Sequence, residues 1–239
     1  MKRTLQALLA MSFLAMIMIS PVAAATSQGL QWGVAKDDQF TFKMIAVDEG
    51  DESFNEGINV TILDAPPALD DPLTNWSNIG YSNLNMTFYN GTTLGLYGIV
   101  FLGLVAVGSL FMIPIGNFTL LTELAQSSVW WNTNCSITDN ALYWGITISG
   151  MSSEMNQTIK AEYLKEDGFA SRYILQSTNT TDSKVSSVSF IRDNLPTLTT
   201  TTNTTGTGFD IIGFVQDNAL YIGLGVVIIL LLVIIVKKH

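Results

Sequence analysis

The chain has 239 residues, of which 48% are hydrophobic and 13% charged, and its formal net charge is −9. All twenty acidic residues, but only seven of the eleven basic ones, lie between residues 26 and 218. Such an acidic surface repels nucleic acid, so we expect no nucleic-acid partner. The single cysteine, Cys135, excludes an intramolecular disulfide, and we expect it to pack as a small apolar side chain.

The first 25 residues have the pattern of a secretory signal peptide. Lys2 and Arg3 precede an uncharged apolar stretch, residues 5–19, and small residues follow at 20–25. We expect cleavage after Ala23 or Ala25. The alternative is an uncleaved N-terminal anchor, for which the apolar stretch is short.

A second targeting segment, a membrane anchor, is expected at the C-terminus. Residues 219–236 carry no charge and are rich in Ile, Leu and Val, and as a helix they would span about 27 Å, enough to cross a bilayer core. Lys237 and Lys238 follow as a cytoplasmic flank. The sequence therefore predicts a single-pass protein of the cell membrane, with its N-terminal domain outside and a tail at 237–239. A GPI-type processing signal is the alternative.

Residues 94–114 form another long apolar run and could be read as a membrane span. However, there is no Lys or Arg between Lys43 and Lys160 to set an orientation. A span here would also place Lys237 and Lys238 outside the cell. We therefore expect the run to be buried within the outer domain, as packed core or as the lining of a cavity.

Nine Asn-x-Ser/Thr sequons suggest glycosylation, roughly three times the number expected by chance. Asn117 also has the pattern of a helix N-cap, so we exclude it. The alternative is that Asn and Thr simply suit turns and strand faces. The candidate acceptors are Asn59, Asn75, Asn85, Asn90, Asn134, Asn156, Asn179 and Asn203.

Below the outer domain, residues 196–208 read as a Thr-rich stalk. Their composition cannot bury enough apolar surface to order the segment, so we expect an extended tether. A juxtamembrane segment, 209–218, would connect it to the membrane helix. The outer domain itself is expected over residues 26–195, the size of a single domain.

Apolar residues alternate with period two along several segments of this domain, the pattern of half-buried antiparallel strands. Asp167-Gly168 between two such runs predicts a hairpin over residues 157–175. A helix is expected over 117–131, capped by Asn117, with Leu121 and Leu124 on its buried side. The other strands are expected at 39–47, 84–89, 142–148 and 183–192.

These elements predict an α+β fold: mainly an antiparallel, curved β-sheet with one or more packed helices, plus the C-terminal transmembrane helix. Three motifs resemble archaeal surface proteins of the choice-of-anchor S family. They are LQWGV at 30–34, continued by Asp38, Phe40 and Phe42; IPIGNFTLLTEL at 113–124; and Glu162-Tyr163 with Lys165 and Asp167-Gly168. Asp37-Asp38 departs from the Gly-Asp that is more frequent in the family. The resemblance implies a common outer domain with variable anchors, and no reaction.

No catalytic, cofactor-binding or metal-binding residues are predicted. The only histidine, His239, falls in the cytoplasmic tail, which excludes His-based metal sites and triads outside the cell. The leading expectation is a non-enzymatic protein for adhesion, recognition or envelope structure. Its partners would be surface glycans or proteins, contacted through some of five tryptophans, Trp32, Trp76, Trp130, Trp131 and Trp144.

Two alternatives remain. In the first, the uncharged middle of the chain lines a pocket for an apolar or lipid-like ligand under the curved sheet. In the second, paired carboxylates from Asp70-Asp71 or from the acidic run 48–52 act as a hydrolase site, which requires that they face each other in a cleft.

Overall fold

The computed structural model describes residues 25–48, 51–95, 101, 110–152 and 155–196. The predicted signal peptide up to residue 24, the stalk after Pro196, Asn203 and the segment 209–239 lie outside the described residues. Within the described ranges, no helix is both long and apolar enough to cross a membrane.

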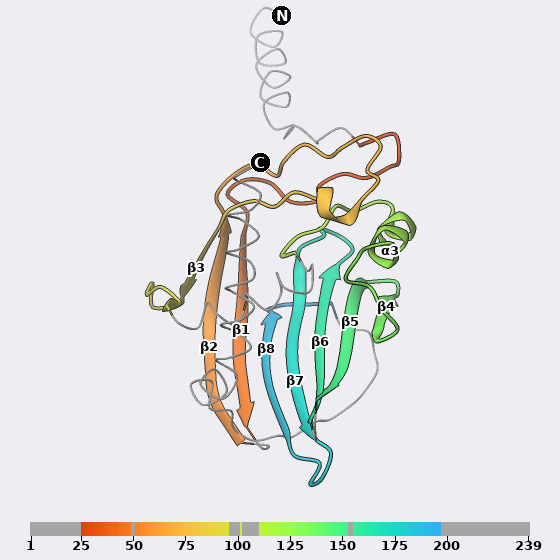
Figure 1. The fold of residues 1–239 in the computed structure, drawn as a ribbon. Helices are drawn as coiled ribbons and strands as arrows, with labels where there is room; N and C mark the ends of the chain where they lie inside the picture. Colours follow the sequence, from red (N-terminus) through yellow and green to blue (C-terminus); the bar gives the residue numbers. More distant parts are fainter. Residues whose placement is uncertain (1–24, 49–50, 96–100, 102–109, 153–154, 197–239) are drawn as a thin grey trace, which may run out of the picture.

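The strands of the described residues form one antiparallel sheet, in the order β3-β2-β1-β8-β7-β6-β5-β4. Figure 1 shows the long strands bending along their length. The α+β fold dominated by antiparallel sheet is therefore confirmed. The strands are β1 (Gln39–Asp48), β2 (Asp51–Ile62), β3 (Leu84–Phe88), β4 (Cys135–Asp139), β5 (Tyr143–Ser152), β6 (Met155–Leu164), β7 (Ala170–Asn179) and β8 (Val185–Arg192).

The first and last strands meet in the middle of the sheet. β1 pairs with β8 over the register Phe42↔Arg192 to Val47↔Ser187. Thus a three-stranded unit from the N-terminal part joins a five-stranded unit from the C-terminal part (Figure 1). Two of these strands, β2 and β4, lie outside the segments for which alternation predicted strands.

One face of the sheet is covered, and the register sorts its side chains into rows. The core row runs across five strands as Met44, Phe190, Tyr173, Ala161 and Ile146, and all five residues are buried. Since directly paired residues share a face, the next row on this face is an aliphatic row. It consists of Ala46, Val188, Leu175, Ile159 and Ile148.

The helix α3 (Phe118–Gln126) covers one end of this face. The indole Nε1 of Trp144 on β5 donates to Thr122 Oγ1 of α3 at 2.9 Å. The ring of Trp144 also stacks on Trp76 of the short 3-10 helix η1 (Trp76–Asn78), with centroids 5.7 Å apart. These contacts place α3 and η1 over the β5 side of the core.

The predicted N-cap of the helix is confirmed, but the predicted C-terminus at residue 131 is wrong. Asn117 Oδ1 accepts from the backbone amide of Leu120 at 3.1 Å. At the other end, α3 stops at Gln126. The hydroxyls of Ser127 and Ser128 both donate to the carbonyl of Leu124, and such side-chain bonds compete with helix continuation.

The predicted hairpin is confirmed, with β6 and β7 paired around the turn. Gly168 has φ 71°, a backbone conformation that glycine adopts without strain. Its carbonyl accepts from the amide of Ile113 at 2.9 Å, and Met112 forms a bridge with Phe169. The turn therefore fastens the end of the apolar run 94–114 to the sheet.

The described residues of that run pack into the core. Leu94, Phe101, Met112 and Ile113 are all buried, and the Phe101 ring meets the Phe190 ring edge-on, with centroids 4.9 Å apart. Residues 96–100 and 102–109 lie outside the description. Leu110 and Phe111 are half-buried and Gly95 is exposed, so burial in the outer domain holds for most, but not all, of the described residues of the run.

Candidate functional site

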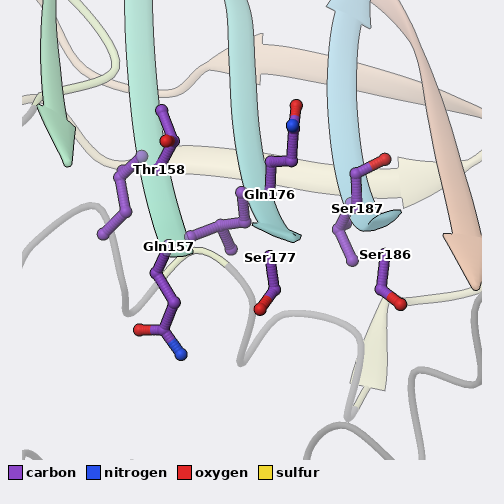
Figure 2. Close-up of a pocket in the computed structure, with 9 residues that line it drawn as sticks. Gln157, Thr158, Gln176, Ser177, Ser186 and Ser187 are labelled. Carbon is purple, nitrogen blue, oxygen red and sulfur yellow. The ribbon is translucent and has the colours of Figure 1, made fainter. Parts of the chain in front are cut away.

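A hollow lies on the covered face where β6, β7 and β8 run side by side. The aliphatic side chains of Ile159, Leu175 and Val188 contribute to its lining, and its volume is about 70 Å³. Beyond them comes a polar row of Gly150, Gln157, Ser177 and Ser186, paired in register. Figure 2 shows Gln157, Ser177 and Ser186 pointing to one side of the sheet, and Thr158, Gln176 and Ser187 to the other.

The hollow results from side chains that become smaller from row to row. In the core row, β7 and β8 carry Tyr173 and Phe190, which pack against Phe101. The next paired positions on this face, toward the end of the hairpin between the two strands, are Leu175 on β7 and Val188 on β8. The positions after those are Ser177 and Ser186. Since alternate residues share a face, each step leaves less volume filled on the covered side.

Ser177 places a buried hydroxyl at the edge of the hollow. Only 6% of the residue is accessible, and its Oγ has no hydrogen-bond partner in the described part of the chain. A buried hydroxyl without a partner costs on the order of 1–3 kcal/mol. A ligand that offers a polar atom beside the aliphatic lining would remove this cost.

A second orphan polar group lies deeper in the core. The hydroxyl of Tyr173 is buried and has no partner among the described residues, whereas that of Tyr163 donates to the carbonyl of Leu110 at 2.5 Å. Burial raises the pKa of Tyr173, so its phenol stays neutral at physiological pH. It is held between the sheet and Phe101 rather than in the hollow.

The structure separates the two groups of candidate carboxylates. Asp48 pairs with Asp51 at the β1–β2 hairpin, whereas Asp70 and Asp71 follow the other end of β2. The ten residues of β1 separate these two ends, a distance of roughly 33 Å. Within the described residues, the acidic run therefore cannot combine with Asp70 or Asp71 in one cleft.

Asp70 and Asp71 each bind a neighbouring side chain on the surface. Asp70 Oδ2 accepts from Asn78 Nδ2 at 2.9 Å. Asp71 accepts from both the backbone amide and the hydroxyl of Ser27, and these hydrogen bonds lower the pKa of its carboxyl. Both residues are exposed, so each carboxylate serves to fix a loop.

No metal site emerges in the part of the chain that is described: no group of three or more His, Cys, Asp and Glu side chains could hold an ion there. His239 lies outside that part. Cys135 is half-buried at the start of the edge strand β4, with its Sγ 4.0 Å from the carbonyl of Trp130. It is thus somewhat less buried than expected.

The five tryptophan side chains pack against other parts of the domain and leave little of their surface exposed. Trp76 and Trp144 are buried, and Trp32, Trp130 and Trp131 are half-buried. The indole of Trp32 donates to the carbonyl of Pro67 at 2.7 Å. Exposed apolar surface is instead provided by Tyr81, Val129 and Met151, which are all largely accessible to solvent.

The sequons fall into distinct environments. Asn179 is half-buried, as is the excluded Asn117, and Asn203 lies outside the described residues. The remaining candidates are exposed: Asn59, Asn75, Asn85, Asn90, Asn134 and Asn156.

No protein-family model, curated protein or solved structure matches this chain.

Proposed function

We propose that this chain is an exported protein of the cell surface, anchored by residues 219–236, whose outer domain serves adhesion, recognition or envelope structure without catalysis. The observation that carries the proposal is the filled core. The core row and the rings around it, with Phe42 stacked on Phe190 at 4.0 Å and Trp76 on Trp144, make a packed platform. Such a domain is suited to presenting its surface.

Its surface chemistry fits contact with other molecules outside the cell. The domain is acidic, and exposed apolar side chains such as Val129 and Tyr81 stand singly on it. The resemblance to choice-of-anchor S proteins of archaea supports the same address, since that family shares an outer domain and varies its anchor.

Deletion of residues 219–239 tests the address. The truncated protein is expected in the medium, whereas the full chain should remain in membranes through carbonate extraction, and both should begin near residues 24–26. A truncated protein that stays in the membrane would show that another segment, such as 94–114, is an anchor. A mature chain beginning at Met1 would contradict the signal peptide.

A second candidate function is the binding of an apolar or lipid-like ligand, favoured by the hollow on β6, β7 and β8. A volume of about 70 Å³ equals about two water molecules at their share of liquid volume. The hollow would thus take the end of an alkyl chain, with a polar group of the ligand at Ser177. A whole lipid would have to extend beyond it.

Titration with 1-octanol tests this candidate. Binding to the native state should raise the melting temperature of the full-length protein in a concentration-dependent way. Ser177→Leu should fill the hollow and abolish the shift, while Ser189→Leu, on the opposite face of β8, should preserve it. An equal shift in both variants would mean that the alcohol binds elsewhere.

A further inference from the structure

In three sequons the amide of the third residue donates to the side-chain oxygen of the first, and one of them is the half-buried Asn179, whose Oδ1 accepts from the amide of Thr181 at 2.8 Å. In the two exposed ones, the hydroxyl of the third residue donates to the same oxygen as well. In one, the amide and the hydroxyl of Ser77 both donate to Asn75 Oδ1 at 3.0 Å. In the other, the amide and the hydroxyl of Thr92 donate to Asn90 Oδ1 at 2.9 and 2.7 Å. In both, the third residue of the sequon thus holds the side-chain oxygen of the first by two hydrogen bonds.

The nitrogen of each amide is left available. Asn75 and Asn90 are exposed, and within the described residues the Nδ2 of neither donates a hydrogen bond. An amide group has one acceptor oxygen and two N–H donors. Because the turn uses only the oxygen, Nδ2 can be modified without loss of these hydrogen bonds.

The same tripeptide pattern at Asn117 is folded differently. Asn117 Oδ1 accepts from the amide of Leu120 as the cap of α3, and its Nδ2 donates to the carbonyl of Gln28 at 2.9 Å. Thr119, the hydroxyl residue of this sequon, is not the partner of its side chain. A sugar on Nδ2 would have to displace the contact with Gln28 at a half-buried position.

A third arrangement occurs on the strands. Asn59 on β2, Asn85 on β3 and Asn156 on β6 belong to the open face, because their register partners alternate with those of the covered face. In extended chain, residues two apart are separated by about 6.6 Å, so the Asn and its Thr cannot form the turn seen at Asn75 and Asn90. These strand sequons are exposed, but the oxygen of their asparagine side chain does not receive the two hydrogen bonds seen at Asn75 and Asn90.

We propose that Asn75 and Asn90 are N-glycosylation sites, and that Asn117 stays unmodified although it has the same tripeptide pattern. The assignment rests on the proposed export of the chain, which brings the domain to the glycosylating side of the membrane. Sugar would then stand on η1 and on the turn that follows β3, away from the hollow on β6, β7 and β8.

The chemistry is a group transfer from a lipid-linked sugar phosphate. Nδ2 forms a bond to C1 of the sugar while the bond from C1 to the phosphate oxygen breaks, and the lipid phosphate leaves with that electron pair. Nδ2 gives up one proton to a base of the transferase, so no oxidant is required. Two donors on Oδ1 stabilise the negative charge that the amide oxygen gains as the proton leaves.

Glycopeptide mass spectrometry of the full-length protein, purified from membranes of the cells that make it, tests the proposal. Peptides with Asn75 and Asn90 should carry the mass of a glycan, and the peptide with Asn117 should not. Thr92→Ala should abolish modification at Asn90 and lower the intact mass by one glycan. Thr92→Ser should preserve it, as should the matched control Thr93→Ala.

The outcomes separate this proposal from the export on which it rests. A modified Asn117, or a Thr92→Ala variant with unchanged occupancy at Asn90, would overturn the assignment. So would a mature, surface-exposed protein whose Asn75 and Asn90 peptides have no added mass. A protein that retains Met1 and remains inside the cell would overturn the export and the glycosylation together.

Discussion

The covered face of the sheet has two ends that differ in how well they are filled. In the core row, Tyr173 and Phe190 pack against Phe101 and Phe111 from the apolar run. In the polar row of the same two strands, a hollow lies beside Ser177 and Ser186, and the hydroxyl of Ser177 has no partner among the described residues. The two rows share the same strands and register, and they differ in the size of their side chains and in the aromatic rings that pack against them.

The largest expected effect comes from the turn that fastens the apolar run to the core. A Cβ at Gly168 would lie 2.1 Å from the carbonyl oxygen of Ile113, and φ there is 71°. Gly168→Val therefore combines a strained backbone, worth roughly 1–3 kcal/mol, with a clash against backbone that cannot rotate away. We expect unfolding or a melting temperature lowered by more than 10 °C, measured by tryptophan fluorescence.

Gly150→Val is the matched control at the hollow end of the same face. A Cβ there meets nothing within 4 Å, and valine suits a strand, so the change in stability should stay within about 0.5 kcal/mol. Similar melting temperatures for the two variants would mean that the fastening of residues 112–113 does not support the core.

The next effect tests the core row directly. Phe190→Ala removes a ring that stacks on Phe42 and meets Phe101 edge-on, and large-to-small changes at such sites cost about 3–5 kcal/mol. Ile191→Ala, the next residue on β8 but half-buried on the open face, should cost roughly 1 kcal/mol. Chemical denaturation of both variants gives the comparison. Equal losses in the free energy of unfolding would show that the two faces of the sheet contribute alike to stability.

The elements that sequence predicted well have strong local signals. Asp167-Gly168 between alternating runs identified the β6–β7 hairpin, and Asn117 identified the start of α3. By contrast, β2 was not predicted because its first residues, Asp51 to Glu56, read as an acidic loop although Ile58 and Val60 are fully buried. Pairing with β1 overrides that composition.

The hollow could not have been located from sequence. Its lining residues come from three strands, and only the register places Ser177 beside Gln157 and Ser186. Alternation along β7 predicts which residues share a face, but the unfilled volume depends on what packs against that face. The pocket hypothesis drew the lining from the uncharged middle of the chain, of which residues 96–100 and 102–109 lie outside the described residues. The lining that the structure does describe lies on β6, β7 and β8.

The smallest expected effect comes from a comparison of two buried serines of β7, and this comparison is also the sharpest test of the hollow. Ser171 is fully buried and its Oγ donates to the carbonyl of Glu162 at 3.0 Å. Ser177 is 6% accessible and has no partner in the described part of the chain. Ser171→Ala should therefore destabilise the protein by about 1 kcal/mol, because a buried carbonyl loses its donor.

Ser177→Val should have the opposite sign. It removes a buried hydroxyl without a partner and extends the aliphatic row into the hollow, so we expect a gain of about 0.5–1 kcal/mol in the free energy of unfolding. Denaturant titration resolves both changes if the slopes of the transitions agree. A loss of stability in Ser177→Val would show that the hydroxyl is satisfied in solution, by water or by a bound molecule. The contrast between a filled and an unfilled end of the face would then have to be explained by an occupied hollow.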